Sequence, residues 1–152
     1  MSEDRVTTHY FEDFETGARH PVGSREITDA DHEAFCRLAG YDAVPLFVDD
    51  AYARRQGLPG RICPSHLIMT FSSAMTGQLK IGSLIAMVGI ERVRFLGMVR
   101  PGDTLRIEVE VVEKRLSSRA GRGVVTFRDH VYNQRNEEVF CNDKIVLIRC
   151  RP

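Results

Sequence analysis

Hydrophobic and polar residues alternate along the second half of the chain with the period of β-strands. From Leu105 to Val111 every second residue is apolar, and the residues between them carry charge. This alternation is typical of a strand with one side in a core and the other in water. Similar runs rich in Val, Ile and Phe predict strands at residues 83–96, 104–114, 123–133 and 138–149. Turn-forming residues at 101–103 and 133–136 predict a meander of antiparallel strands.

Residues 64–80 show a different pattern, with apolar side chains on nearly every side of a helix. Pro64 suits the first helical position, where its missing N–H costs nothing. Leu67, Phe71 and Met75 are among the apolar residues that follow. A helix that is apolar on all sides is buried, so we predict a central buried helix.

Two shorter helices are predicted in the first part of the chain. Thr28 is a suitable N-cap with acidic residues in the turn after it, and Gly40 ends that helix. Asp49 caps a second helix over residues 50–56. We place His32 on the solvent-exposed side of the first helix, and residues 19–27 form a segment that leads into it.

Early helices, one buried helix and a strand meander together predict an α+β architecture. A curved antiparallel sheet wrapped around one long apolar helix satisfies this order with short connections, and this arrangement is called the hot-dog fold. The 152 residues match the usual size of one domain. We therefore expect a single domain over residues 1–152.

Charge is balanced, with 21 Lys and Arg residues against 21 Asp and Glu residues. Nucleic acids and anionic membranes attract a positive field, so we expect neither as a partner. The balance also favours self-association.

The sequence shows no CxxC pair, leader, spanning segment or zinc-ligand spacing. These features predict a cytoplasmic protein with reduced thiols and no metal.

The first candidate site is the start of the buried helix, around Cys63, Ser65 and His66. Free backbone N–H groups and the positive end of a helix can hold the oxygen of a polarised carbonyl. Asp42, upstream between two helices, is either a turn residue or the carboxylate of this site. Ser73 is either a site residue or a small residue that lets a strand approach the helix. Cys63 is best interpreted as a small buried hydrophobe.

Several segments resemble one protein family over nearly the whole chain. They are YFEDFETG at 10–17, ITDAD at 27–31, DAVPLF at 42–47, VDDAYA at 48–53, GLPGRI at 57–62 and FLGMVRPGDTL at 95–105. In order and spacing the chain is similar to MaoC-type dehydratases, the (R)-specific enoyl-CoA hydratase branch of the hot-dog superfamily. The resemblance implies a lyase that acts on enoyl or 3-hydroxyacyl thioesters, with acyl-CoA as substrate and no separate cofactor.

The resemblance also assigns roles to individual residues, with two departures from the family pattern. Asp42 matches the catalytic Asp, but Phe47 occupies the position of the catalytic His, and Val44 that of an Asn. Ser65 stands where the family has a Gly whose N–H binds the thioester carbonyl, and Ser73 matches a Ser beside the catalytic pair. Phe47 cannot transfer a proton, and losing one positioned acid–base group costs roughly 10²–10⁴ in rate. Together with Val44, it makes the mouth of the pocket more apolar.

Further candidates are one histidine and three arginines. His66 is the nearby imidazole that would replace the missing proton carrier, and its alternative role is a polar residue at a subunit interface or in water. Arg61, Arg92 or Arg94 would meet the phosphates of CoA. The alternative for these arginines is an ordinary place on the surface.

Three functions remain open at this point. The first is a hydratase or dehydratase with an altered site, and the second is a non-catalytic acyl-thioester-binding subunit that partners a related chain. An acyl-CoA thioesterase is a weaker alternative, because the buried helix contains no acidic residue. The resemblance also implies at least a dimer, either a homodimer or a heterodimer, with sheets joined edge to edge and pockets at the interface.

Overall fold

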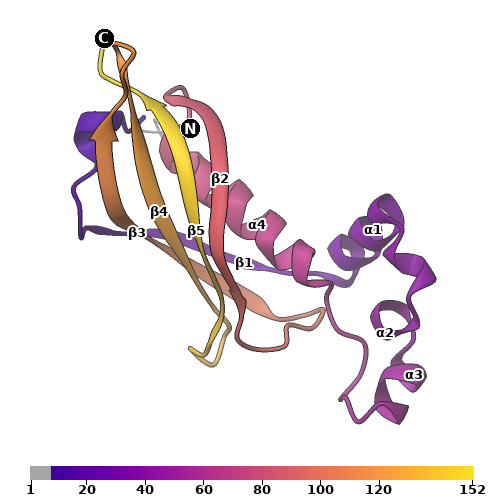
Figure 1. Ribbon diagram of the computed structural model, residues 1–152. Coiled ribbons are helices and arrows are strands. Elements are labelled where there is room, and N and C mark those ends of the chain that lie inside the picture. Colours follow the sequence, from indigo (N-terminus) through magenta and orange to yellow (C-terminus); the bar gives the residue numbers. More distant parts are fainter. Residues whose placement is uncertain (1–7) are drawn as a thin grey trace, which may run out of the picture.

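A curved antiparallel sheet of five strands wraps a long helix in the computed structural model, which describes residues 8–152 (Figure 1). The strands lie in the order β1-β3-β4-β5-β2. Their bounds are β1 Arg19–Glu26, β2 Leu84–Phe95, β3 Thr104–Leu116, β4 Arg122–Tyr132 and β5 Glu138–Arg149. The helical elements are η1 Phe11–Asp13, α1 Asp29–Ala39, η2 Tyr41–Ala43, α2 Pro45–Val48, α3 Asp50–Arg55, α4 Ser65–Gly77 and η3 Gln78–Lys80. The predicted α+β class and hot-dog fold are confirmed.

The strands follow the predicted alternation. Leu105, Ile107 and Val109 of β3 are buried, and the charged residues between them are partly exposed. The alternation does not predict β1, because Pro21 and Gly23 interrupt a strand pattern. β1 nevertheless pairs with β3, and its register shifts between these two residues as in a β-bulge.

The helix ends in the first part of the chain are capped as predicted. The Thr28 hydroxyl accepts the N–H of Asp31 at 3.0 Å, and the Asp31 carboxylate accepts the N–H of Thr28 at 3.2 Å. Gly40 ends α1 with φ 80°, a left-handed conformation that glycine adopts without strain. Asp49 caps α3 by accepting the N–H of Tyr52. These local contacts fix the ends of α1 and α3, which lie with α2 beyond one end of the sheet, on the side where α4 starts (Figure 1).

The central helix α4 is confirmed, but its predicted burial on every side is wrong for the single chain. Leu67, Ile68, Ser72 and Thr76 are buried. The opposite side, which includes His66, Thr70 and Ala74, is exposed. The reason is geometric, since the sheet of one chain covers only one side of the helix.

Two separate apolar clusters form the core. One gathers at the start of α4 and includes Leu67, Val131 and Phe140. The other lies toward η1 and includes Phe127 and Val146. Along both β4 and β5, polar residues lie between the members of the two clusters. No helix within residues 8–152 is long and apolar enough to span a bilayer.

Candidate active site

The start of α4 offers backbone donors. Pro64 is the N-cap, and its side chain provides no acceptor for the first N–H groups of the helix. The N–H of Leu67 bonds to the Pro64 carbonyl at 3.0 Å, whereas no side-chain cap serves Ser65 and His66. These N–H groups lie at the positive end of the helix dipole. A carbonyl oxygen that gains negative charge would be stabilised there.

A cavity of about 330 Å³ adjoins this helix start. It is lined by Ile62, Cys63, Ser65, Ile68 and residues 95–99. The Cys63 side chain is buried, and its backbone N–H donates to the Val99 carbonyl at 2.8 Å. Burial raises the pKa of the Cys63 thiol to about 12. Cys63 therefore lines the cavity as a small uncharged side chain. The uncharged thiol is a poor nucleophile.

An aromatic cluster connects the segment containing Asp42 to α4. The Tyr41 hydroxyl and His66 Nδ1 are 3.0 Å apart, within hydrogen-bond distance, and their rings are stacked. Phe47 contacts Tyr41 edge to face with 5.3 Å between ring centroids, and the Phe35 ring stacks on that of Tyr41. The sequence patterns did not predict a role for Tyr41. The one indication in the sequence was its position directly before Asp42. Through Tyr41, His66 is held next to the short η2 helix.

Asp42 lies in η2 and its side chain is exposed in the single chain. Val44 is the N-cap of α2 and also lines an apolar cavity of about 400 Å³ with residues of α2 and α3. Phe47 lies in α2 and does not line that cavity. Asp42 thus directly follows Tyr41, the residue that contacts His66, and Phe47 is not among the residues that line the cavity beside Val44.

The prediction that His32 faces solvent is wrong, because its side chain is fully buried. Its Nε2 atom lies 2.6 Å from the Phe47 carbonyl oxygen, so the ring donates a hydrogen bond to α2. Cys36 Sγ is 3.7 Å from the same nitrogen. α2 contacts the side of α1 that carries His32. The spacing of apolar residues within α1 alone does not predict this contact. His32 thereby positions the backbone of α2.

Neither Arg61 nor Ser73 lines the cavity at the helix start. The Arg61 guanidinium pairs with Asp29 at 2.7 Å and with Glu33 at 3.7 Å, which ties the segment before α4 to α1. Ser73 follows Ser65 by eight residues, a rise of roughly 12 Å along a helix. It lines a separate small cavity together with two lysines, Lys80 and Lys144.

Sequence reasoning missed these two lysines. A compositional signal was available, because the chain contains 3 Lys and 18 Arg residues. Two of the three lysines are buried. Lys144 also occupies an inward position of the predicted last strand.

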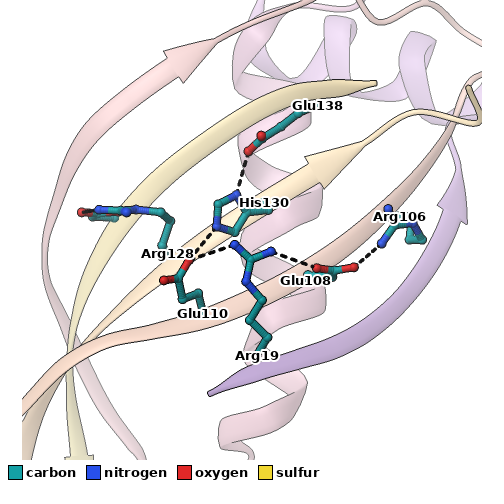
Figure 2. A network of polar contacts seen from close by, with 8 residues as sticks. Arg19, Arg106, Glu108, Glu110, Arg128, His130 and Glu138 are labelled. Carbon is teal, nitrogen blue, oxygen red and sulfur yellow. Dashed lines mark hydrogen bonds and ion pairs between the residues drawn. The ribbon is translucent and has the colours of Figure 1, made fainter. Parts of the chain in front are cut away.

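The outer face of the sheet carries a second group of charged side chains, on the opposite side from α4 (Figure 2). His130 lies between Glu138, at 2.7 Å, and Glu110, at 3.0 Å. Arg19 reaches both Glu110 and Glu108 at 3.3 and 3.5 Å. Partly exposed pairs of this kind contribute about 0–1 kcal/mol each. They link neighbouring strands and do not contribute to the candidate site.

Comparison with known proteins adds independent findings. A family model described as a MaoC like domain matches residues 14–133. Mesaconyl-CoA hydratase from Cereibacter sphaeroides is 32% identical over 147 residues, which cover 93% of this chain and 41% of that protein. The chain spans less than half the length of the curated relatives that it matches.

Solved structures agree with this result. The monoamine oxidase regulatory protein from Archaeoglobus fulgidus has a TM-score of 0.85 and 33% identity, covering 95% of this chain and 97% of that one. The unliganded (R)-hydratase PhaJ1 from Pseudomonas aeruginosa has a TM-score of 0.75 and 25% identity, covering 93% and 86%. The fold and the family match thus define a hot-dog domain of the MaoC-like dehydratase type. The chain belongs to the family of MaoC-like domains.

Proposed function

We propose that the chain acts as a hydratase or dehydratase on enoyl and 3-hydroxyacyl thioesters, with acyl-CoA or an acyl-carrier thioester as substrate. The observation that carries the proposal is the uncapped start of α4, where Ser65 lines a cavity of about 330 Å³. Family membership supports it, as do relatives named as a mesaconyl-CoA hydratase and an (R)-hydratase. The proposal includes no metal or separate cofactor.

The proposed reaction needs a base, an acid and an oxyanion site. The base takes one proton from water while the water oxygen bonds to C3 of the enoyl group. The electron pair of the C2–C3 double bond moves toward the thioester, which becomes an enolate, and the acid then delivers a proton to C2. We assign stabilisation of the enolate oxygen to the Ser65 N–H at the positive end of α4.

We assign the proton transfers to Asp42 and His66. Phe47 carries no group that can hold or release a proton. The hydrogen bond between Tyr41 and His66 supports this assignment, because it holds the imidazole beside the element that bears Asp42. Ser73, farther along α4, would orient the acyl part of the substrate.

A second candidate function is an acyl-thioester-binding subunit without turnover of its own. The observation that favours it is Phe47, which packs against Tyr41 at the position where the family has its histidine. Such a subunit would work with a related chain that carries the complete Asp–His pair. The thioesterase alternative remains weaker, since α4 contains no acidic residue.

We also propose that a second chain completes the site, as a homodimer or as a heterodimer with a related chain. β2 is the last strand of the sheet, so one of its edges has no neighbouring strand within residues 8–152. Its exposed apolar side chains include Leu84, Val88 and Phe95. Unpaired strand edges with apolar side chains favour pairing with another chain. Pairing there would also place a second chain near the exposed side of α4.

Hydration of crotonyl-CoA by the purified protein tests the catalytic proposal. We expect activity in the parent and a loss of roughly 10²–10⁴-fold in Asp42→Asn. Glu26→Gln, which neutralises an exposed carboxylate on β1, is the matched control and should retain activity. Equal rates in the parent and Asp42→Asn would remove Asp42 from the mechanism. Activity that appears only in Phe47→His would support the non-catalytic subunit.

A further inference from the structure

A belt of buried polar residues crosses the core between the two apolar clusters. We define this polar belt by its six members: Ser72, Thr76, Lys80, Asp129, Asn142 and Lys144. Asp129 and Asn142 are paired in register across β4 and β5, and Lys144 follows on the same side of β5. Buried polar groups are costly unless they are paired. The position of the belt beneath α4 therefore calls for a physical explanation.

Within the polar belt the charges do not balance. Lys144 Nζ lies 2.6 Å from Asp129 Oδ2, and the Ser72 hydroxyl donates to the same oxygen at 2.8 Å. The remaining cation is Lys80, whose Nζ donates to the Thr76 carbonyl at 2.8 Å. Lys80 also lies over the Phe127 ring. The belt thus holds two lysines and one carboxylate.

The surroundings disfavour the charge on Lys80. Burial and, secondarily, the neighbouring ammonium of Lys144 lower the pKa of Lys80 to about 7, while Asp129 acts in the opposite direction. An additional negative charge nearby would balance the second lysine. Several polar atoms of the belt also form no hydrogen bond. Asp129 Oδ1 and both polar atoms of the Asn142 side chain are buried without a hydrogen-bond partner within the described part of the chain.

A small cavity opens onto the polar belt. Ser73, Lys80 and Lys144 contribute its polar lining, and Leu84, Met87 and Val146 contribute apolar walls. Its volume is about 50 Å³. One water needs roughly 10–15 Å³ on the same scale, so the cavity accepts a group about the size of a carboxylate. Ser73 lies roughly 12 Å beyond Ser65 along α4, and it is also our candidate for orienting the acyl group.

We propose that this cavity binds a carboxylate at the far end of the acyl group, and that thioesters of dicarboxylic acids are therefore the preferred substrates. This inference rests on the proposed binding of acyl thioesters. A bound carboxylate balances the second lysine with a second anion and accepts hydrogen bonds from Lys80. A methyl group at that end of the acyl chain would instead leave the charge of Lys80 without a counterion. Lys80 is thus a specificity-determining residue.

Binding measurements with saturated thioesters test the inference without any turnover. Isothermal titration calorimetry would compare three matched pairs: succinyl-CoA with butyryl-CoA, adipoyl-CoA with hexanoyl-CoA, and suberoyl-CoA with octanoyl-CoA. In at least one pair we expect the parent to bind the dicarboxylic member about tenfold more tightly or better, as for a charged hydrogen bond in a buried site. Lys80→Met should lose this preference.

The control is Lys114→Met, which removes the one lysine outside the polar belt and should keep the preference. Lys80→Met leaves the pair between Lys144 and Asp129 intact, so it should fold, as a thermal denaturation curve would verify. Binding of the monocarboxylic member as tightly or more tightly in every pair would overturn the inference alone. A preference that persists in Lys80→Met would overturn it as well. A failure of all six thioesters to bind would overturn the proposed function, and the inference with it.

Discussion

Lys144 of β5 and Asp129 of β4 form an ion pair of 2.6 Å whose two side chains are 2% and 0% exposed. Both charges are thus almost completely removed from bulk water. Taking the two charges out of water costs several kcal/mol per ion, which their attraction offsets only with good geometry and further hydrogen bonds. Ser72 supplies one such bond to Asp129. The pair is therefore sensitive to the loss of either partner.

Replacing Lys144 with methionine should destabilise the protein strongly. The change leaves the Asp129 carboxylate buried without its main cation, which costs about 3–5 kcal/mol in comparable cases. Urea denaturation followed by circular dichroism would measure the free energy of unfolding. Lys144→Met combined with Asp129→Asn should recover part of the loss, because the isolated charge is removed as well. A change below about 1 kcal/mol in the single variant would contradict this account of the pair.

The free energy of unfolding should rise with pH because of Lys80. Its pKa is about 7 in the folded protein, against an ordinary value of 10.5. Between these values the unfolded chain binds a proton that the folded chain does not, so stability increases with pH. One proton gives a slope of up to about 1.4 kcal/mol per pH unit. The stabilising effect is complete above pH 10.5 and is lost as the pH falls through about 7.

Lys80→Met isolates this contribution, because it lacks the titrating amine. The difference in unfolding free energy between the parent and Lys80→Met should grow in favour of the parent as the pH rises above 7. Cys63, whose pKa is raised by burial, acts in the opposite direction above pH 9. That effect is common to both proteins and cancels in the difference. Parallel stability curves for the two proteins would show that Lys80 does not titrate in this range.

The proposed role of His66 predicts a large loss of activity in His66→Gln. Glutamine keeps hydrogen-bonding capacity but transfers no proton, so the rate of crotonyl-CoA hydration should fall by roughly 10²–10⁴. Tyr41→Phe removes the hydroxyl that meets Nδ1 and keeps the stacked ring, so its loss should be smaller. His130→Gln, on the outer face of the sheet, is the matched control. An unchanged rate in His66→Gln would eliminate this histidine as a proton carrier.

The exposed edge strand predicts that the oligomer depends on β2. Val88 is 60% exposed in the single chain, and Val88→Glu places a charge where we propose a second chain. Size-exclusion chromatography with light scattering should show at least a dimer for the parent and a monomer for this variant. Leu116→Glu, at a residue 68% exposed at the end of β3, should not change the mass. A parent monomer, or an unchanged mass in Val88→Glu, would argue against pairing through β2.

Local signals in the sequence predicted most of the secondary structure. The caps at Thr28 and Asp49 depend on contacts three residues apart, so they can be read directly from the chain. The alternation in β3 and the position of α4 follow from side-chain periods in the same way. Pro21 and Gly23 concealed β1, because pairing with β3 stabilises that strand more than its own residues do.

The candidate site was predictable only in part. Asp42, Ser65 and His66 were found through their neighbourhood in the sequence and through resemblance. Tyr41 gained significance only when the fold brought it to His66, which is 25 residues away. His32 was misplaced because its burial depends on α2, which packs over the side that the period of α1 left open.

The element types, the helix caps, the hot-dog class and the family resemblance can all be read from the chain without its structure. These features arise from short-range contacts, periodicity and motif order. Folding, by contrast, brings Lys80 and Lys144 to a cavity beneath α4 that Ser73 also lines, and pairs Lys144 with Asp129. The state of a buried charge depends on partners on other elements, and the packing of a helix on a sheet selects those partners.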